Sequence, residues 1–102
     1  MAPTEEVADR KNEGKPQLSY MLDFPKGMAE LVKVCEYGAG KYSRDNWKMG
    51  GKPAAEYFDC AMRHMQKAWT NQGGTKAYDE ESKAHHLGHA VWNALAYLEL
   101  TT

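Results

Sequence analysis

Cysteine is scarce in this sequence, and long hydrophobic runs are absent. Among 102 residues only Cys35 and Cys60 are cysteines, and both fall in helical-looking segments rather than at the loop positions of a small disulfide scaffold. We interpret them as small buried hydrophobic residues of a protein in a reducing environment. Neither a signal peptide nor an apolar run long enough to span a bilayer is visible, which predicts a cytoplasmic protein without membrane contact.

An excess of charge of one sign is also missing. The sequence has 13 basic and 14 acidic side chains, and its formal net charge is -1 at pH 7. Such a balance argues against a general clamp for polymeric nucleic acid. A phosphate-bearing ligand must therefore be bound by local groups.

The length predicts one domain preceded by a short tail. Residues 1–16 carry many charged side chains and almost nothing to bury, so we predict a flexible tail followed by a single domain over residues 17–102. A domain this short buries a smaller share of its surface than a large one does. We therefore expect self-association to complete its packing.

Three segments carry apolar residues at spacings of three and four, the period of a helix packed on one face. The first should begin near Pro25, the second near Pro53 and the third within Asp79–Ser82. Alternating strand patterns are absent, so we predict an all-α fold, a small helical bundle completed by homo-oligomerisation. The stripes predicted to form its core are Met28, Leu31, Val32, Cys35 and Ala39; Phe58, Ala61, Met62, Met65 and Trp69; and Leu87, Val91, Ala94, Leu95 and Leu98.

Acidic residues recur at two places. Glu56 and Asp59 lie one helical turn apart, so both carboxylates can face one volume, where a Mg²⁺ or Mn²⁺ ion would relieve their repulsion. For this pair alone, a solvated face balanced by Arg63 is the favoured interpretation. Asp79 and Glu81 stand at the expected entry to the third helix, where a carboxylate could complete a cation site or simply complement the helix dipole.

The third predicted helix carries an unusual polar stripe. Ser82, His86, His89 and Asn93 follow one another at spacings of four, three and four, and core stripes are seldom so polar. The two histidines could bind a metal, donate to phosphate oxygens or transfer protons. We favour such a role over the alternative that both are satisfied histidines between helices.

The segment Gly38–Trp47 combines glycines with basic, amide and aromatic side chains. Lys41 could bind phosphate, and Tyr42, Asn46 and Trp47 could hold a base or sugar. The spacing of a P-loop is absent. Taken singly, Tyr42 and Trp47 are more often packing residues than base-stacking ones.

Several of these stretches together resemble one known family. They form three blocks: Glu36–Tyr42 with Asn46 and Trp47; Asp59–His64; and Asp79–Ser82 leading to His86–Ala90 and Asn93. Their order and spacing are similar to those of the N-terminal domain of phage dATP/dGTP diphosphohydrolases, over about Leu18 to Leu100. Because three separated blocks agree, the resemblance is more specific than any block alone.

The resemblance implies an all-α nucleotide pyrophosphohydrolase, similar to the MazG-like enzymes, that cleaves a purine deoxynucleoside triphosphate to monophosphate and pyrophosphate with a divalent metal. MazG-like enzymes build the metal site from an E-x-x-E block followed by an E-x-x-D block. Here Glu56-x-x-Asp59 resembles the first block. The second is not reproduced, and Asp79-x-Glu81 with His86 and His89 stand where it would be expected. A phage-encoded enzyme of this kind would work in the host cytoplasm.

The resemblance also implies roles for individual residues. Glu56, Asp59 and Glu81 would bind Mg²⁺ or Mn²⁺, and a carboxylate or His89 would activate water for attack on the α-phosphorus. The residues expected to contact the substrate are Lys41, Arg63 and His86 at the phosphates, Tyr42, Asn46 and Trp47 at the base or sugar, and Asn93 beside the histidines.

Two other classes of function remain open. The same pocket could sequester a nucleotide, including a cyclic nucleotide that serves as a defence signal, without turnover. The missing second block favours this hypothesis, whereas the acidic residues favour an enzyme. Alternatively, the protein could be a helical interaction module in which His86, His89 and Asn93 pair across a symmetry axis.

Overall fold

A computed structural model describes residues 13–102 of the chain. No strand occurs in this range, where an isolated antiparallel bridge joins Tyr78 to His85. The predicted all-α class is therefore confirmed, whereas most of the predicted tail, residues 1–12, lies outside the described residues. The helical elements in chain order are η2 (Leu18–Leu22), α1 (Pro25–Lys41), η3 (Asn46–Met49), α2 (Ala54–Thr70), η4 (Thr75–Ala77) and α3 (His86–Thr101).

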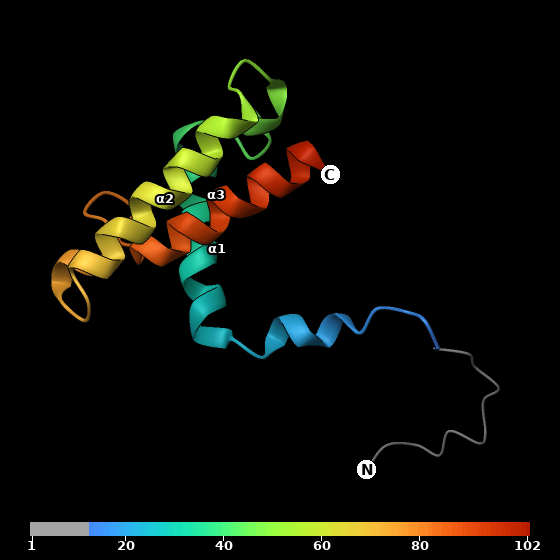
Figure 1. Cartoon of the computed structure of the whole chain (residues 1–102), viewed down its shortest axis with the longest axis horizontal. Helices are drawn as coiled ribbons and strands as arrows, with labels where there is room; N and C mark the ends of the chain where they lie inside the picture. Colours follow the sequence, from blue (N-terminus) through green and yellow to red (C-terminus); the bar gives the residue numbers. More distant parts are fainter. Residues whose placement is uncertain (1–12) are drawn as a thin grey trace, which may run out of the picture.

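The helices α2 and α3 form the centre of the fold. They lie side by side and run in opposite directions, while α1 crosses behind α3 (Figure 1). At the crossing of α1 and α3, a Cβ atom placed on Gly88 would lie 3.0 Å from the backbone oxygen of Glu30. Glycine at this position therefore allows the two helix backbones to approach closely.

The first two helices begin where the prolines predicted. Pro25 occupies the first turn of α1, where its missing N–H leaves no intrahelical hydrogen bond unmade. Pro53 is the N-cap residue of α2, in an extended conformation. Local backbone chemistry was therefore sufficient to place both starts.

The third helix begins later than predicted, at His86 rather than within Asp79–Ser82. The Asp79 carboxylate accepts a hydrogen bond from the backbone of Ser82 at 2.8 Å, and Lys83 has a φ of 65°. A helix cannot continue through such a left-handed residue. His85 then caps α3, because its Nδ1 accepts the backbone N–H of Leu87 at 2.9 Å. Residues 79–84 thus form a turn that precedes the helix.

The core consists mainly of small side chains, contrary to the stripes predicted from periodicity. Tyr57 and the alanines of both helices bring α2 and α3 together, and the polar His86 and Asn93 are buried with them. Cys35, predicted to be buried, is exposed, and Cys60 is half-buried. The buried hydrophobic residues of the described chain are Val34, Tyr57, Ala61, Ala68, Ala77, Ala84, Ala90 and Ala96.

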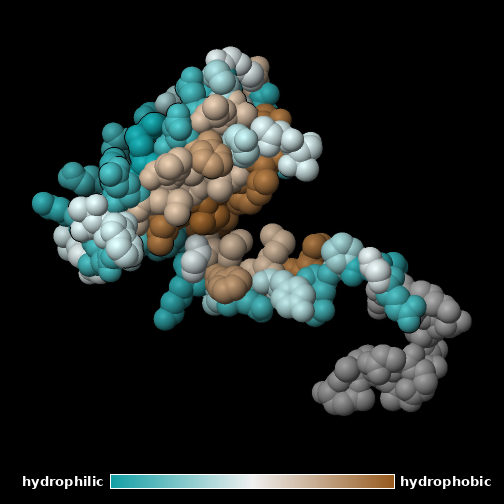
Figure 2. Space-filling view, viewed as in Figure 1, coloured by the Kyte–Doolittle hydropathy of each residue, from teal (hydrophilic) through white to brown (hydrophobic). Residues whose placement is uncertain are grey.

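Most large apolar side chains of the predicted stripes lie on the surface instead. We call the exposed set on α2 and α3 the apolar face. Most of its residues come directly after an inward-facing residue in the sequence and are therefore rotated by about 100° around the helix axis. Because α2 and α3 run in opposite directions, this rotation places both sets on the same side of the helix pair. Figure 2 shows apolar residues gathered over this region. The apolar face consists of Phe58, Met62, Met65 and Trp69 on α2 and Leu87, Val91, Leu95 and Leu98 on α3.

Among residues 13–102, no helix is long and apolar enough to cross a bilayer.

Candidate functional site: a histidine cluster between α2 and α3

Three imidazoles meet between α2 and α3, and we call them the histidine cluster. The Nδ1 atoms of His64 and His86 lie 3.0 Å apart, so one ring donates and the other accepts a hydrogen bond. The rings of His64 and His89 stack with centroids 4.5 Å apart and an interplanar angle of 12°. The polar stripe of α3 therefore faces α2 within one chain.

The turn before α3 supplies the next contacts of this cluster. Ser82 Oγ lies 2.6 Å from His89 Nε2, and an Asp79 carboxylate oxygen lies 3.8 Å from the same nitrogen. Asn93 donates its side-chain N–H to the backbone oxygen of His89 at 2.9 Å. Although Ser82 is not on the helix as predicted, the turn still brings its hydroxyl to His89.

Burial holds the histidine cluster in its uncharged form. The pKa of His64 is lowered to about 4, mainly by desolvation and further by the neighbouring His89 and His86. Desolvation also lowers the pKa of His89, against the opposing effect of Asp79, and it lowers the pKa of His86 together with Lys67. For Asp79, burial acts to raise the pKa, but hydrogen bonds from Ser82 outweigh it and the pKa is lowered. At neutral pH the cluster combines neutral imidazoles with an ionised carboxylate.

Lowering the pH from 7 to 5 is expected to destabilise the fold. An unfolded histidine binds its proton near pH 6.5, whereas folded His64 does so only near pH 4. Between these values the unfolded state binds more protons, so the free energy of unfolding falls as the pH drops through 6.5 and levels off near 4. We expect His64 alone to account for on the order of 1 to 2 kcal/mol of this loss.

Thermal melting measured from pH 7 to pH 4 would test this expectation. The His64→Leu variant, which cannot titrate at this position, should show a flatter dependence of melting temperature on pH than the natural chain. Equal slopes for the two proteins would mean that His64 is not held uncharged in the folded state.

A second group of side chains joins α1 to the turn, and we call it the Glu81 cluster. Tyr37 donates its hydroxyl to the carboxylate of Glu81, and Lys41 Nζ lies 4.0 Å from the same carboxylate. The ammonium of Lys41 also lies 5.6 Å from the ring centroid of Tyr37 and 5.5 Å from that of Tyr42. A hydrogen bond with Tyr37 is the main cause that raises the pKa of Lys41, and electrostatic interactions with Tyr37, Tyr42 and Glu81 add to it.

The two clusters are adjacent, because Glu81 and Ser82 are neighbours in the same turn. Five residues of the predicted site belong to these two clusters, which the turn connects. They are Lys41, Tyr42, Glu81, His86 and His89. Asn93 supports this region from the next turn of α3.

Trp47 is engaged in packing rather than left open for a base. Its ring lies edge-on to Tyr57 at 6.5 Å and to Trp92 at 5.6 Å between centroids, and Tyr57 donates its hydroxyl to the Trp47 backbone oxygen at 3.4 Å. Asn46, the first residue of η3, is exposed. Contact of Asn46 and Trp47 with a substrate stays a prediction.

The structure does not bring the three predicted metal ligands together within one chain. Among residues 13–102, no group of three or more His, Cys, Asp or Glu side chains could hold a metal ion. Glu56 lies in the first turn of α2 and is exposed, as is Asp59, whereas Glu81 belongs to the segment that follows the other end of this helix. Arg63, exposed on α2, contacts the sulfur of Cys60 at 3.0 Å. The metal-binding role of these carboxylates stays a prediction.

Two members of the assembled site, His64 and Asp79, are not among the site residues selected from the sequence. His64 could have been recognised, because it continues the inward stripe of α2 formed by Tyr57, Ala61 and Ala68 at spacings of three and four. Asp79 was expected either to complete a cation site or to complement the helix dipole, and its role as the acceptor of the Ser82 turn depends on where α3 begins.

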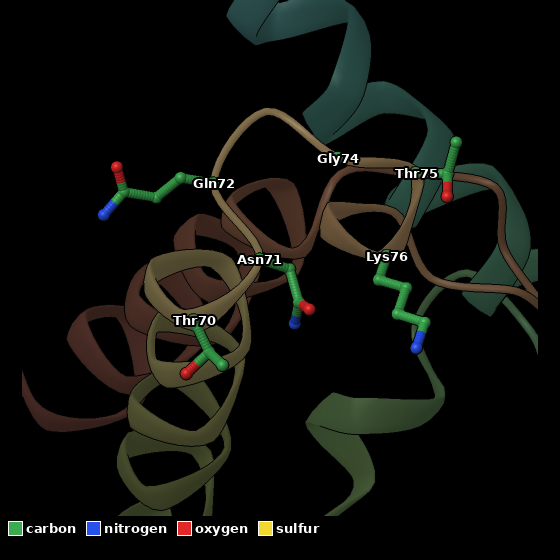
Figure 3. A pocket seen from close by; sticks show the side chains of 6 residues that line it. All are labelled: Thr70, Asn71, Gln72, Gly74, Thr75 and Lys76. Carbon is green, nitrogen blue, oxygen red and sulfur yellow. The ribbon is translucent and has the colours of Figure 1, made fainter.

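The surface also contains a polar hollow at the turn between α2 and η4. In Figure 3 the side chains of Gln72 and Thr75 point outward on different sides, and Lys76 is the only charged residue of the lining. Polar groups that do not converge form no defined binding site, so we place no function there. The lining residues are Thr70, Asn71, Gln72, Gly74, Thr75 and Lys76.

Comparisons with known proteins point to a single family. A family model described as dATP/dGTP diphosphohydrolase, N-terminal, matches residues 5–102, which is nearly the whole chain. Comparison with curated proteins and with solved structures found no match.

Proposed function

Because this chain belongs to the dATP/dGTP diphosphohydrolase N-terminal family, we propose that it is a phage-type enzyme that hydrolyses purine deoxynucleoside triphosphates to monophosphate and pyrophosphate. The observation that carries the proposal is the histidine cluster, which the turn of Glu81 and Ser82 connects to the contact of Lys41 with Glu81. A cationic group can neutralise phosphate charge in such a reaction, and a neutral imidazole can accept the proton of the attacking water.

His89 is the residue that we assign to the proton transfer. Its side chain is 12% exposed, so a water molecule can reach it, and its lowered pKa keeps the ring neutral and able to accept a proton. In the proposed step, the oxygen of a water molecule bonds to the α-phosphorus, and a proton of this water passes to His89. The bond between the α-phosphorus and the oxygen that bridges it to the β-phosphorus breaks, so that this oxygen leaves with the pyrophosphate. The products are the nucleoside monophosphate and pyrophosphate.

Asp79 and Ser82 orient the proposed base. Ser82 Oγ at 2.6 Å and the Asp79 carboxylate at 3.8 Å both address the Nε2 atom of His89. The nearby carboxylate would stabilise the ring once it has gained a proton. Lys41, whose pKa is raised, would carry its charge to the phosphates.

A requirement for Mg²⁺ or Mn²⁺ is part of the proposal but enters none of these steps. The predicted ligands Glu56, Asp59 and Glu81 do not fit a metal ion as one chain holds them. The family resemblance, together with the negative charge of a triphosphate, is what supports the requirement.

The proposal includes self-association through the apolar face. The eight side chains of this face are between 46% and 76% exposed. Aromatic side chains bury roughly 150 to 250 Å² each, and large aliphatic ones somewhat less, so the face offers on the order of 600 to 800 Å². This is close to what each partner contributes to a standard interface, about 800 Å².

Turnover of dATP, dGTP, ATP and GTP with Mg²⁺ or Mn²⁺, followed by chromatography of monophosphate and pyrophosphate, would test the proposed reaction. We expect the deoxynucleotides to be hydrolysed, and chelation of the metal to stop the reaction. The Glu56→Ala/Asp59→Ala variant should lose at least about tenfold in turnover if these carboxylates act in the assembled protein. Activity that survives chelation would exclude the metal requirement, and an unchanged double variant would remove both residues from the site.

A nucleotide-sequestering protein is the second candidate function. The absence of a grouped metal site among the described residues favours it. This candidate predicts tight binding of a nucleotide, including cyclic ones, without product formation. By contrast, the third hypothesis of histidines paired across a symmetry axis is wrong for His86 and Asn93, because both are buried within one chain.

A further inference from the structure

The segment before α1 exposes five large apolar side chains, and we call Leu18–Phe24 the arm. Their exposed fractions are 70% for Leu18, 66% for Tyr20, 58% for Met21, 77% for Leu22 and 68% for Phe24. Isolated exposed hydrophobic residues are common on protein surfaces, but a contiguous group of this size marks an interaction site. The arm therefore needs an occupant for its apolar side.

The arm is held away from the bundle of its own chain. In Figure 1 it extends outward from the start of α1, and Figure 2 shows apolar atoms along it that remain uncovered. Pro25 and the hydrogen bond from the Met28 N–H to the Phe24 backbone oxygen, 2.8 Å long, fix the direction in which the chain leaves α1. The arm therefore leaves the bundle of its own chain uncovered.

A groove beside the base of the arm offers a matching surface. It has a volume of about 550 Å³ and runs between the first turns of α1 and the first turns of α3. Leu87 and Val91 belong both to this groove and to the apolar face, so the two surfaces are continuous. The groove is lined by Lys26, Gly27, Ala29, Glu30, Tyr78, His85, Leu87, Gly88 and Val91.

We propose that the arm of each copy lies in the groove of a second copy, in a reciprocal exchange. This inference rests on the self-association proposed above and specifies how it is built. Around a two-fold axis, each copy donates its arm to its partner and accepts the partner's arm in its own groove. Both arms and both grooves are then occupied. The exchange adds the five apolar side chains of the arm to an apolar face that alone only approaches the area of a standard interface.

A variant of the arm tests the proposal by its effect on mass. Leu18→Ser/Met21→Ser/Leu22→Ser removes apolar contacts without touching the bundle, and Gln17→Ser/Ser19→Ala/Asp23→Asn is the matched control in the same segment. Sedimentation velocity over a range of concentrations should show self-association at least about 100-fold weaker for the arm variant and unchanged for the control.

A variant of the apolar face distinguishes self-association through this face from the exchange of arms. Met65→Lys/Leu98→Lys lies outside the groove and should also yield monomers. If this variant dissociates while the arm variant stays assembled, self-association stands and arm exchange is overturned. If the natural chain is monomeric at all concentrations, both are overturned, whereas the proposed hydrolysis is tested separately because the readout is mass.

Disulfide trapping tests which groove the arm occupies. In a Cys35→Ser/Cys60→Ser background, chains with Met21→Cys in the arm are mixed with chains of different size that carry Ala29→Cys in the groove. We expect a disulfide between the two kinds of chain. Disulfides only between arms, or a disulfide closed within single chains that carry both cysteines, would overturn the exchange. A lack of any arm disulfide, combined with binding of the natural chain to lipid vesicles that the arm variant loses, would assign the arm to a membrane instead.

Discussion

Replacing His89 by glutamine is expected to lower turnover of dATP and dGTP by about 100- to 10,000-fold, the usual contribution of a positioned acid or base. Glutamine can keep a hydrogen bond to Ser82, which lies 2.6 Å from the ring in the natural chain, but it cannot accept a proton. Steady-state kinetics should therefore show the loss in kcat. Affinity for the nucleotide should change much less.

The control for this variant is His85→Asn. His85 precedes the cluster and caps α3 through its side chain, and asparagine is among the best N-cap residues. The control should keep near-normal turnover and stability. If His89→Gln retained full turnover, His89 would not be the base, and one of the carboxylates Asp79 and Glu81 would become the next candidate.

Replacing Gly88 by valine is expected to lower the free energy of unfolding by about 3 kcal/mol. A Cβ atom at this position already lies 3.0 Å from the Glu30 oxygen and 3.1 Å from the Glu30 carbonyl carbon. These are backbone atoms of α1, which cannot rotate away as a side chain can. The branched side chain would force α1 and α3 apart and also remove the hydrogen bond from the His85 N–H to the Glu30 carboxylate, which is 2.8 Å long.

Chemical denaturation of Gly88→Val beside Gly38→Ala would separate this crossing effect from helix propensity. Gly38 lies in α1, and a Cβ atom added there would meet nothing within 4 Å, so alanine at this position should be neutral or stabilising by up to about 1 kcal/mol. The change in the free energy of unfolding for Gly88→Ala should fall between those of the other two variants. Alanine has a better helix propensity than glycine, but its Cβ atom enters the tight contact with Glu30. Unchanged stability of Gly88→Val would mean that the crossing is not held as closely as described.

The sequence predicted the helical class and much of the candidate site. The starts of α1 and α2 followed from Pro25 and Pro53, which act through their own backbone. Lys41, Glu81, His86 and His89 were selected by type and pattern, and the structure places them in two clusters that one turn connects. The predicted metal site of Glu56, Asp59 and Glu81 does not form within one chain. The spacing along α2 relates Glu56 to Asp59, but it does not determine where Glu81, which follows the other end of this helix, will lie.

The start of α3 was misjudged because acidic residues favour both a first helical turn and a tight turn. Asp79 uses its carboxylate to accept the Ser82 N–H, which closes a turn and delays the helix to His86. The same geometry then places the Ser82 hydroxyl at His89. Ser82 thus lies beside His89, although it is not on the helix as predicted.

The sequence by itself determined that the chain forms helices with one small, partly polar stripe and one large apolar stripe, since both repeat with the helical period. Only the tertiary structure decided which stripe faces inward. Alanines such as Ala61 and Ala90 and the glycine at position 88 permit the close approach of backbones, and the histidines satisfy one another when they are buried together. Periodicity measures the contrast between two faces of a helix. It does not specify whether the apolar face meets another helix of the same chain or, as we propose, a second copy.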